Sequence, residues 1–519
     1  MMRTPLLVRS IAERAGRLFA EREIVSVTAT GVERSSWGEV IERARRLASA
    51  LHALGIRPGD RVATFGWNSV RHLELYLAVP SMGAVLHTLN IRLFDDDLRY
   101  IVSHGEDRVI FLDASLAERM PSFEGVEHEI LMPDADAARE GALDYETLIT
   151  SGDGAFEFPE LDENCAAAMC FTSGTTGKPK GVVYSHRSTV LHALFANQAD
   201  TLGLRERDTV LPIVPMFHAN AWGMPYAAAL AGSKLVLPGP RMDPAELAKL
   251  IADERVTFAG AVPTIWQGIA QLDPRADLSS VERLLCGGSA VPESLIRLYD
   301  ERFGVPIIQA WGMTETSPVA SMSRVRPGGA GAIDSDEAYA IRAMQGRVLP
   351  FVEFRIDEEA GGELQVRGPT IARSYYNDDS GAEKFTEDGW LRTGDVAEIE
   401  DGAFIKLVDR TKDLVKSGGE WISSVALENE IMAHPDVIEA AVVAVPDESW
   451  GERPCACVVR RAGSELDGDA LRDFLRTRVA KWWLPERVEF IAEVPKTSVG
   501  KFNKRVLRSQ LADGTLEGG

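Results

Sequence analysis

The chain has little cysteine for its length. Five of its 519 residues are cysteines, namely Cys165, Cys170, Cys286, Cys455 and Cys457. A small, disulfide-stapled secreted fold is excluded by so few and so widely spaced thiols, and we expect a reducing, cytoplasmic compartment. Cys455 and Cys457 have no second Cys/His cluster nearby in sequence, so we interpret them as alternating positions of a strand rather than as metal ligands.

Positive charge is also scarce. The 56 Lys and Arg residues face 78 Asp and Glu residues, which gives a formal net charge of −22. Binding to nucleic acid or to an anionic membrane depends on a basic footprint, so we expect no nucleic-acid partner. Any anionic substrate must be held by positive groups gathered at one place.

Long apolar runs are missing as well. No uninterrupted apolar run approaches the roughly 18 residues that span a bilayer, and none lies near the N-terminus as a secretory signal would. Arginines give the first 22 residues some transit-peptide character, but Glu13 and Glu21 interrupt it. The spacing of Leu7, Ile11 and Leu18 instead favours an amphipathic helix folded onto the protein. We therefore expect neither a membrane span nor a targeting segment.

The chain is apolar enough to fold throughout and too long for one core. Hydrophobic residues make up 45% of it, so two or more domains are expected. From Trp37 to Leu54 apolar residues recur every three or four positions, which predicts a helix, and a strand at 61–65 follows. Short apolar runs then alternate with helical stretches, which predicts a largely parallel sheet covered by helices. The predicted strands are 210–214, 234–237, 256–258, 284–286 and 307–309, and the predicted helices include 244–254 and 292–302.

The character of the sequence changes twice in its last third. Near residue 348 short alternating strands begin, at 352–356 and 363–367, and predict a small antiparallel subdomain. After residues 409–412 a compact α+β pattern starts. We predict an N-terminal domain at 1–408 and a C-terminal domain at 409–519, and the lack of a polar linker predicts a tight hinge between them.

The segment 172–181 is the strongest functional signal. It reads Thr-Ser-Gly-Thr-Thr-Gly-Lys-Pro-Lys-Gly and follows the apolar run 166–171. Glycines let backbone N–H groups converge, hydroxyls add neutral donors and lysines add charge, which together suit a polyphosphate. A Walker loop requires Gly and Ser/Thr where this segment has Thr172 and Pro179, so that interpretation fails at both ends.

This segment resembles the phosphate loop of the adenylate-forming superfamily, which includes acyl-CoA synthetases, luciferases and nonribosomal adenylation domains. The family's other motifs follow in order over nearly the whole chain. The resemblance implies an α/β fold. Its large N-terminal domain has two βα-layered subdomains and a small distorted antiparallel β-barrel, and a small mobile α+β C-terminal domain follows.

The resemblance also implies a nucleotide site. The segment 312–316, Gly-Met-Thr-Glu-Thr, is similar to the one whose Thr and Glu face the nucleotide, and Glu315 with Thr172 would bind Mg²⁺. Trp311 stands where relatives usually have Tyr, and its ring is expected to stack on adenine. Asp395 would bind the ribose hydroxyls. The implied ATP/AMP-binding set is Thr172, Ser173, Gly174, Thr175, Thr176, Gly177, Lys180, Gly288, Ser289, Ala290, Trp311, Gly312, Thr314, Asp395 and Arg410.

The C-terminal motifs imply a domain that moves between two steps. Segment 409–423 resembles the family's hinge and following loop, with Lys412 at the hinge position. Segment 495–501 resembles the one that carries the catalytic lysine, here Lys501, which would neutralise charge at the α-phosphate. The residues implied for acyl or CoA binding are Trp222, Lys416, Gly418, Gly419 and Trp421.

The acyl site is expected around segment 215–222, which resembles the acyl-site lining of fatty acyl-CoA synthetases. His218 would orient the carboxylate and is counted with Lys501 and Glu315 as catalytic. Trp222 would close over the acyl chain. A satisfied buried histidine and plain core packing remain the alternatives for His218 and Trp222. The resemblance is greatest to medium- and long-chain fatty acyl-CoA synthetases and to relatives that act on methylthiopropanoate.

The predicted function is therefore an acid–thiol ligase of fatty acid or lipid metabolism. It would activate a carboxylic acid with ATP and Mg²⁺ to acyl-AMP, and then transfer the acyl group to CoA. Two alternatives stay open, namely a ligase that delivers the acyl group to a carrier protein, and a non-catalytic acyl or nucleotide sensor. The sequence leaves the acid and the oligomeric state undetermined, and a homodimer is one assembly considered.

Overall fold

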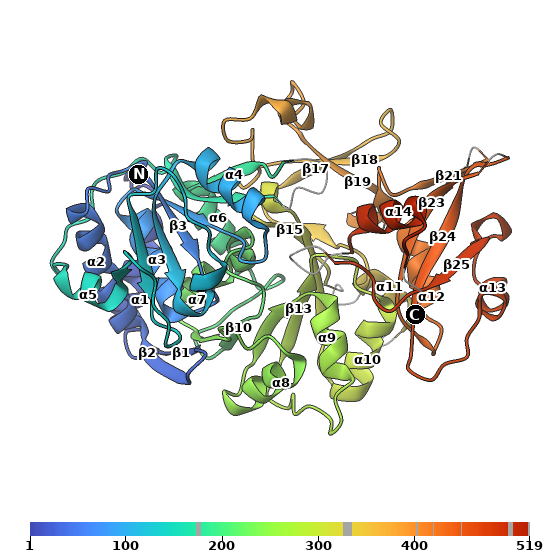
Figure 1. Ribbon diagram of the computed structural model, residues 1–519, viewed down its shortest axis with the longest axis horizontal. Helices are drawn as coiled ribbons and strands as arrows, with labels where there is room; N and C mark the ends of the chain where they lie inside the picture. Colours follow the sequence, from blue (N-terminus) through green and yellow to red (C-terminus); the bar gives the residue numbers. More distant parts are fainter. Residues whose placement is uncertain are drawn as a thin grey trace.

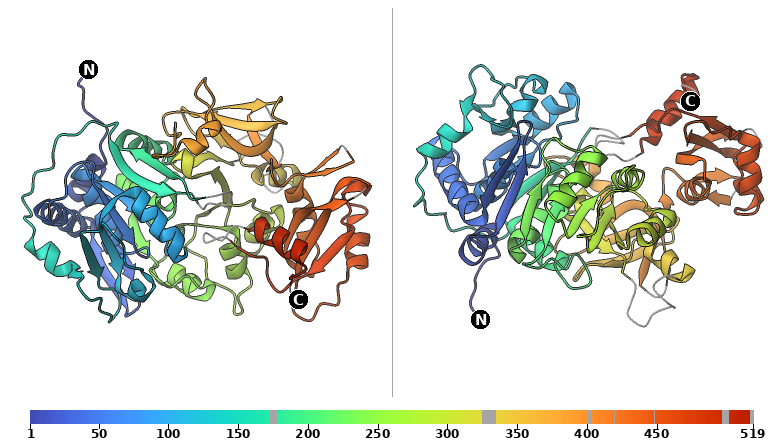
Figure 2. Two further views of the ribbon diagram at one scale, coloured as in Figure 1. Left: turned by 45° about the horizontal axis from the view of Figure 1, so that its top comes forward. Right: turned by 90° about the horizontal axis from the view of Figure 1, so that it is seen from below.

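The protein has a large N-terminal domain and a small C-terminal domain, which lies at the right of Figure 1. The computed structural model describes residues 1–172, 178–324, 335–400, 403–418, 420–447, 449–496 and 502–516. Two large sheets form most of the N-terminal domain, and a four-stranded antiparallel sheet stands beside them. Figure 2 gives two further views of this arrangement.

The first large sheet has seven strands in the order β7-β6-β5-β3-β4-β8-β9. All neighbours in it are parallel except β8 and β9, which form an antiparallel pair. The strands are β3 (Arg61–Phe65), β4 (Val85–Thr88), β5 (Asp107–Asp113), β6 (His128–Met132), β7 (Leu143–Asp144), β8 (Ala166–Phe171) and β9 (Gly181–Ser185). Its helices are α2 (Trp37–Ala53), α3 (Val70–Ser81), α4 (Asp95–Gly105) and α5 (Tyr145–Ser151), with the 3₁₀ turn η1 (Ala114–Arg119).

The second large sheet has nine strands in the order β16-β15-β14-β13-β12-β10-β11-β1-β2. They are β1 (Glu23–Val27), β2 (Val32–Ser36), β10 (Thr209–Pro212), β11 (Lys234–Leu237), β12 (Phe258–Ala261), β13 (Arg283–Gly287), β14 (Ile307–Gly312), β15 (Val319–Met322) and β16 (Arg347–Val348). The helices with it are α6 (His186–Ala196), α7 (Met224–Ala231), α8 (Pro244–Asp253), α9 (Pro263–Ala270), α10 (Glu293–Phe303) and α11 (Asp336–Arg342). Short 3₁₀ turns are η2 (Ala219–Gly223) and η3 (Thr314–Thr316).

The remaining strands form two smaller sheets. The antiparallel sheet β17-β18-β19-β20 consists of β17 (Glu353–Asp357), β18 (Glu363–Arg367), β19 (Leu391–Glu400) and β20 (Phe404–Arg410), with η4 (Asp379–Lys384) beside it. The C-terminal sheet contains β21 (Val415–Ser417), β22 (Glu420–Ile422), β23 (Val437–Asp447), β24 (Gly451–Arg460) and β25 (Arg487–Phe490). It carries α12 (Ser424–Met432), α13 (Gly468–Leu475), η5 (Lys481–Trp483) and α14 (Lys504–Asp513).

The N-terminal and C-terminal domains have separate clusters of buried apolar side chains. The largest cluster of buried apolar side chains includes Trp37, Tyr76 and Tyr226 and draws on both large sheets. The C-terminal domain has two clusters of its own, one around Leu427 and one around Leu507. Burying a large apolar side chain contributes about 1.5–3 kcal/mol to folding stability, so each domain is stabilised by its own apolar core.

Several sequence predictions are confirmed here. The helix predicted from Trp37 is α2, the strand at 61–65 is β3, and Cys455 and Cys457 are buried neighbours on one face of β24. The strand predicted at 256–258 was misplaced, because β12 begins at Phe258 and runs through Ala259, Gly260 and Ala261. Alanine and glycine have low strand propensity, so no sequence pattern indicated that shift. The boundary predicted at residue 409 falls inside β20 and stays a prediction.

The N-terminal segment forms α1 (Val8–Leu18), which packs on α2 and α7. Its buried residues are Val8, Ile11, Ala12 and Ala15, one face of the helix, so the predicted amphipathic helix is confirmed. Leu18, which the prediction placed on the same face, is instead 51% exposed. Within the described ranges, no helix has the length and apolarity needed to cross a membrane.

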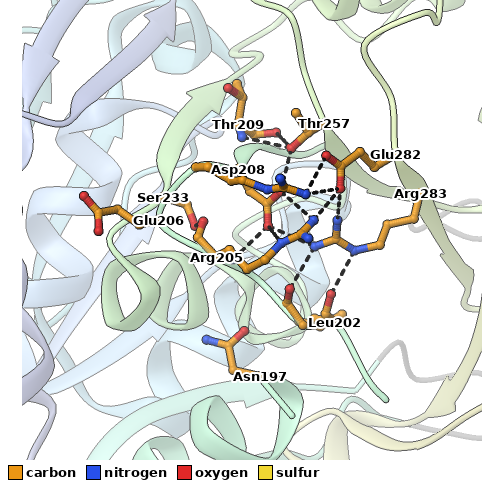
Figure 3. A network of polar contacts seen from close by, with 12 residues as sticks. Asn197, Leu202, Arg205, Glu206, Asp208, Thr209, Ser233, Thr257, Glu282 and Arg283 are labelled. Carbon is orange, nitrogen blue, oxygen red and sulfur yellow. Dashed lines mark hydrogen bonds and ion pairs between the residues drawn. The ribbon is translucent and has the colours of Figure 1, made fainter. Parts of the chain in front are cut away.

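The amino edge of the second sheet is closed by a network of ion pairs (Figure 3). Asp208 precedes β10, and its buried carboxylate accepts a hydrogen bond from Arg283 of β13 at 3.0 Å. Arg205 and Glu282 join the same network. These polar groups occupy the edge where the parallel strands begin, and the opposite edge, where the strands end, is left for a ligand.

Buried histidines predict how stability depends on pH. Burial lowers the pKa of His72 and of His186 to about 4. An unfolded histidine has a pKa near ~6.5, so below that pH the unfolded chain binds protons that the folded protein does not. This contribution to stability is complete above pH 6.5 and is lost as the pH falls toward 4. The loss from each histidine between pH 7.5 and 5.5 should be about 1.4 kcal/mol.

Urea unfolding of wild type and His72→Gln at the two pH values measures this contribution. The variant should show the smaller change in unfolding free energy between pH 7.5 and 5.5, whatever its stability at either pH. Identical changes in the two proteins would contradict a neutral buried His72.

Candidate active site

A cleft of about 920 Å³ opens at the carboxyl ends of β13 and β14 and extends to β19 and β20. Most of the predicted site residues that the structure describes lie on its walls. Those that line it are Thr172, Lys180, His218, Trp222, Gly288, Trp311, Gly312, Thr314, Glu315, Arg410 and Lys412. Residues at the ends of several strands thus converge on one space, as is usual for ligand sites in α/β proteins.

Some predicted residues lie elsewhere. Ser289 and Ala290 follow Gly288 but are not among the lining residues. Asp395 is buried and does not line the cleft either, although its partners Trp311 and Arg410 do. Lys416, Gly418 and Trp421 belong to the C-terminal domain away from the cleft. Ser173, Gly174, Thr175, Thr176, Gly177, Gly419 and Lys501 lie outside the described residues.

The two ends of segment 172–181 are held side by side. The backbone N–H of Thr172 donates to the carbonyl oxygen of Lys180 at 2.9 Å, and the N–H of Lys180 donates to Thr172 Oγ1 at 3.1 Å. The antiparallel pairing of β8 with β9 places Phe171 opposite Gly181 and so creates this neck. A Cβ at Gly181 would lie 3.1 Å from the Phe171 ring. The backbone of Lys180, at the base of the segment, is therefore held in a defined position.

Glu315 is oriented by a tyrosine that the sequence did not single out. Tyr375 Oη donates to Glu315 Oε1 at 2.7 Å, and Glu315 is buried although it borders the cleft. Burial and the charge of Glu315 raise the pKa of Tyr375, so its hydroxyl stays protonated and remains a donor. Lys180 Nζ lies 5.0 Å from the centroid of the same tyrosine ring. A charged carboxylate held this way has lone pairs left for a hard cation.

A magnesium ion suits this wall of the cleft. Glu315 offers carboxylate oxygens and Thr172 offers a hydroxyl, and both residues border the same space. In the part of the chain that the structure describes, no three His, Cys, Asp or Glu side chains gather as a ready-made metal site. The donor set therefore fits an ion that takes most of its ligands from phosphate and water, as Mg²⁺ does.

Asp395 is the centre of a second group of contacts. Trp311 Nε1 donates to its Oδ2 at 2.9 Å, and Arg410 Nε lies 3.0 Å from its Oδ1. Asp395 and Arg410 face each other in the register of β19 and β20, while Trp311 comes from β14 of the second large sheet. Each carboxylate oxygen keeps a lone pair that can accept a hydroxyl. The sequence predicted both the aromatic ring and the carboxylate here, but not the hydrogen bond between them.

Positive charge gathers on the same walls. Lys180, Lys384, Arg410 and Lys412 all line the cleft. Burial lowers the pKa of Lys412, and the neighbouring charges of Arg410, Arg508 and Lys384 lower it further. Cations that repel one another are relieved by an anion between them. A chain of charge −22 thus has the local positive site that an anionic substrate requires.

One wall of the cleft has a left-handed backbone. Ala219, Asn220, Ala221, Trp222 and Gly223 have φ angles of 42°, 51°, 49°, 55° and 75°. Each non-glycine residue in this region costs about 1–2 kcal/mol. Such strain is kept where packing over-determines it, commonly at functional sites. The side chains of this turn are almost wholly buried, which is how the conformation is held.

His192 supports this turn from behind. A Cβ at Gly223 would lie 2.6 Å from His192 Nδ1, so only glycine fits there. His192 Nε2 accepts the backbone N–H of Val319 at 3.2 Å, and Val319 borders the cleft. Burial lowers the pKa of His192 to about 4, which keeps the ring neutral and able to accept. A lone histidine inside a helical segment gave no sequence signal for this role.

Trp222 marks the inner end of the cleft. Its ring lies 3.5 Å from the Cβ position of Gly287, and 7% of the residue is exposed, so it both packs in the core and faces the cleft. Nearby, Asn220 and Tyr226 border a separate cavity of about 10 Å³, room for about one water molecule. His218 borders the cleft one turn before Trp222.

The residues predicted for thiol binding gather on the C-terminal domain. Lys416 Nζ lies 5.3 Å from the Trp421 ring on the hairpin of β21 and β22. Gly418 has a φ of 61°, and a Cβ there would lie 2.6 Å from the ring of Trp450. Trp450 is half exposed and was not predicted from the sequence.

The contact between Trp311 and Asp395 can be tested by Trp311→Phe. This change keeps an aromatic ring and removes the only N–H of the side chain, which leaves Asp395 one donor short. A hydrogen bond to a charged group contributes about 1.5–3 kcal/mol, so the KM for ATP should rise about tenfold or more. Steady-state pyrophosphate release at varied ATP measures it.

Trp390→Phe is the matched control for that change. Trp390 is equally buried and packs under Arg355 and Arg367, at 4.6 and 4.5 Å, without contacting Asp395. An unchanged KM for ATP in Trp311→Phe, or an equal rise in both variants, would rule out the role given to the indole N–H.

Comparison with known proteins agrees with the site. Residues 12–376 match the family model described as AMP-binding enzyme, and residues 426–501 match the AMP-binding enzyme C-terminal domain. The first match includes most of the residues that line the cleft, and the second includes most of the C-terminal domain.

Similar proteins of known activity cover nearly the full chain. A long-chain-fatty-acid–CoA ligase of Thermus thermophilus is 46% identical over 98% of this chain and 96% of its own length. A medium-chain-fatty-acid–CoA ligase of Ectopseudomonas oleovorans is 44% identical over 99% and 97%. A 3-methylmercaptopropionyl-CoA ligase of Ruegeria pomeroyi is 43% identical over 99% and 98%.

Among solved structures, ATP-bound MatB from Rhodopseudomonas palustris superposes with a TM-score of 0.82 at 27% identity. The match covers 97% of this chain and 99% of that one. The arrangement of a large N-terminal and a small C-terminal domain is therefore shared with an adenosine-nucleotide-binding protein.

Proposed function

The chain belongs to the AMP-binding enzyme family, and from that premise we propose how its cleft carries out ATP-dependent acyl-CoA synthesis. The enzyme joins a carboxylic acid to CoA and consumes ATP. The observation that carries the assignment of roles is the convergence in one cleft of Glu315, the lysines of the wall, and the two partners of the buried Asp395.

The first step makes a better leaving group than the acid itself offers. The acid's carboxylate attacks the α-phosphorus of ATP, a new O–P bond forms, and the bond to the β-phosphate oxygen breaks to release pyrophosphate. Asp395 accepts the ribose hydroxyls, and Lys180 and Arg410 balance phosphate charge. Glu315 and Thr172 would hold Mg²⁺, which would supply positive charge to the phosphates. Lys501 completes the site by neutralising charge between carboxylate and α-phosphate.

The second step transfers the acyl group to sulfur. The CoA thiol, as thiolate, attacks the acyl carbon, the bond to the phosphate oxygen breaks, and AMP leaves. In our proposal the C-terminal domain turns about the hinge at Lys412, so that the β21–β22 hairpin with Lys416, Gly418 and Trp421 replaces the Lys501 segment at the cleft.

The substrate we propose is an apolar acid, either a medium- to long-chain fatty acid or methylthiopropanoate. Support comes from the apolar side of the cleft, where Ala219, Trp222, Ala310 and Val319 face the space beside the phosphate wall. His218 would orient the carboxylate at the entrance to this side. Because Trp222 is almost wholly buried where it lines the cleft, a long chain would have to displace this ring.

We also propose a cytoplasmic location, supported by the five cysteines, which are all free thiols. A homodimer stays a prediction that sedimentation can test.

The proposed function is tested with one panel of acids. Straight-chain acids from acetate to palmitate, methylthiopropanoate and an aryl acid are each mixed with ATP, Mg²⁺ and CoA, and acyl-CoA is measured by mass spectrometry. Apolar acids should be converted and acetate should be a poor substrate. Accumulation of acyl-AMP without acyl-CoA would favour the carrier-protein alternative, and absence of pyrophosphate release with every acid would favour a sensor.

The role of Lys501 is tested by Lys501→Ala. Loss of a positive charge aligned with the transition state should slow adenylation about 100-fold or more. Thioester formation from chemically prepared acyl-AMP and CoA should stay close to the wild-type rate. An equal loss in both half-reactions would contradict the assigned role.

A further inference from the structure

A chain of buried polar contacts joins the last helix to the start of the hinge. Lys504, the first residue of α14, pairs with Glu428 of α12 at 2.7 Å and donates to Ser424 Oγ at 2.6 Å. Ser424 in turn donates to Asp409 Oδ2, from its hydroxyl at 2.6 Å and from its backbone N–H at 2.5 Å. The other oxygen of Asp409 accepts the backbone N–H of Arg410 at 2.7 Å.

The same chain of contacts continues into the nucleotide site. Arg410 pairs with Asp395, and Asp395 accepts the indole N–H of Trp311. An unbroken series of hydrogen bonds and ion pairs therefore connects α14 with the carboxylate that we assign to the ribose. Lys504 stands three residues after Lys501 in the sequence, at the beginning of the helix that follows it.

A second basic residue of α14, Arg508, contacts the hinge itself. Arg508 lies one helical turn after Lys504, so both side chains project from the same face of the helix. Arg508 Nη2 is 2.5 Å from Asp413 Oδ1 and 3.3 Å from the carbonyl oxygen of Lys412. Arg508 thus contacts the hinge residue and the residue after it, whereas Lys504 is linked to Asp409, before the hinge, through Ser424.

These charges are shielded from water. Exposed fractions are 10% for the Lys504 side chain and 7% for Glu428, and Asp409 is 3% exposed. Burial raises the pKa of Asp409 and of Glu428 against the opposing effect of Lys504. Burial disfavours the charged lysine, but Glu428, Asp409 and Asp413 outweigh it and raise the pKa of Lys504. Buried pairs of this kind tolerate little change in geometry, because separating them leaves a charge without compensation.

The cluster joins two different domains. Asp409 belongs to β20 of the four-stranded sheet beside the two large sheets, whereas Ser424, Glu428 and Lys504 belong to helices packed on the C-terminal sheet. In Figure 1, α14 lies on the side of the C-terminal domain that faces the centre of the molecule, and β21 lies at its outer edge. Arg410 and Lys412 line the cleft, and Lys416, Gly418 and Trp421 do not. A rotation about Lys412 would separate Ser424 from Asp409.

We propose that Lys504 is a positioning residue for adenylation. Through Glu428, Ser424 and Asp409 it fixes the orientation of α14 relative to β20 and the cleft, and Lys501 precedes Lys504 by three residues in the sequence. Thioester formation requires this cluster to open, so its contacts favour the first half-reaction over the second. The inference rests on the proposed function, because it assumes that the two half-reactions use two orientations.

The experiment measures both half-reactions separately in the full-length enzyme. Adenylation is followed as pyrophosphate release from ATP and acid in single-turnover mixing, and thioester formation as acyl-CoA made from prepared acyl-AMP and CoA. The variants are Lys504→Met and the double variant Glu428→Gln/Lys504→Met. The double variant removes the uncompensated carboxylate, so its thermal stability should recover toward that of wild type.

We expect adenylation to fall about 10- to 100-fold in both variants. The thioester step should change less than about threefold or become faster, a ratio that destabilisation alone would not produce. Lys504→Arg keeps the charge and should restore a large part of the adenylation rate.

Glu430→Gln is the matched control. Glu430 lies on the same helix as Glu428 but pairs with Arg478 at 2.7 Å, on the surface and away from β20. This variant should keep the wild-type ratio of the two rates.

Two outcomes would overturn the proposal. One is a stable double variant with the wild-type ratio, and the other is an equal loss in both half-reactions. Failure of the proposed function would look different, because wild type itself would then release no pyrophosphate or would form no acyl-CoA from acyl-AMP and CoA.

Discussion

A buried carboxylate must be paired, and the pairing of Asp395 holds this site together. Its two partners come from different sheets, the indole of Trp311 from β14 and the guanidinium of Arg410 from β20. Burying an unpaired carboxylate costs several kcal/mol, about as much as a large part of a domain's net stability, so neither partner is dispensable. This one carboxylate joins β19 to β20 and to β14 of another sheet at the wall of the cleft.

The other constraints follow from where the strands end. The base of segment 172–181 is set by the β8–β9 ladder, and Glu315 is set by Tyr375 rather than by its own backbone. The opposite wall is a left-handed turn kept in place by burial, by Gly223 and by His192. The strained backbone of this wall is held by protein packing behind it. Its conformation therefore does not depend on a ligand.

The sequence predicted the parts of the site that depend on local pattern. Glycine-rich loops and short motifs consist of residues that are close together in the sequence, so such residues could be predicted. Those that line the cleft are Thr172, Lys180, Glu315, Arg410 and Lys412. The alternation of strands and helices likewise predicted the sheets, since periodicity is local. By contrast Tyr375, His192 and Trp450 act through residues far away in sequence. A tyrosine 60 positions from its glutamate leaves no pattern, and only the fold brings the two together.

The two domains have separate apolar cores, and the contacts between them at the hinge are mainly hydrogen bonds and ion pairs. Opening such contacts exchanges polar groups with water and exposes little hydrocarbon. Since apolar exposure is what produces a large heat-capacity change, the balance between domain orientations should be nearly independent of temperature. The populations of the two domain orientations should then be similar at low and high temperature. Added salt should change these populations, because it screens charge.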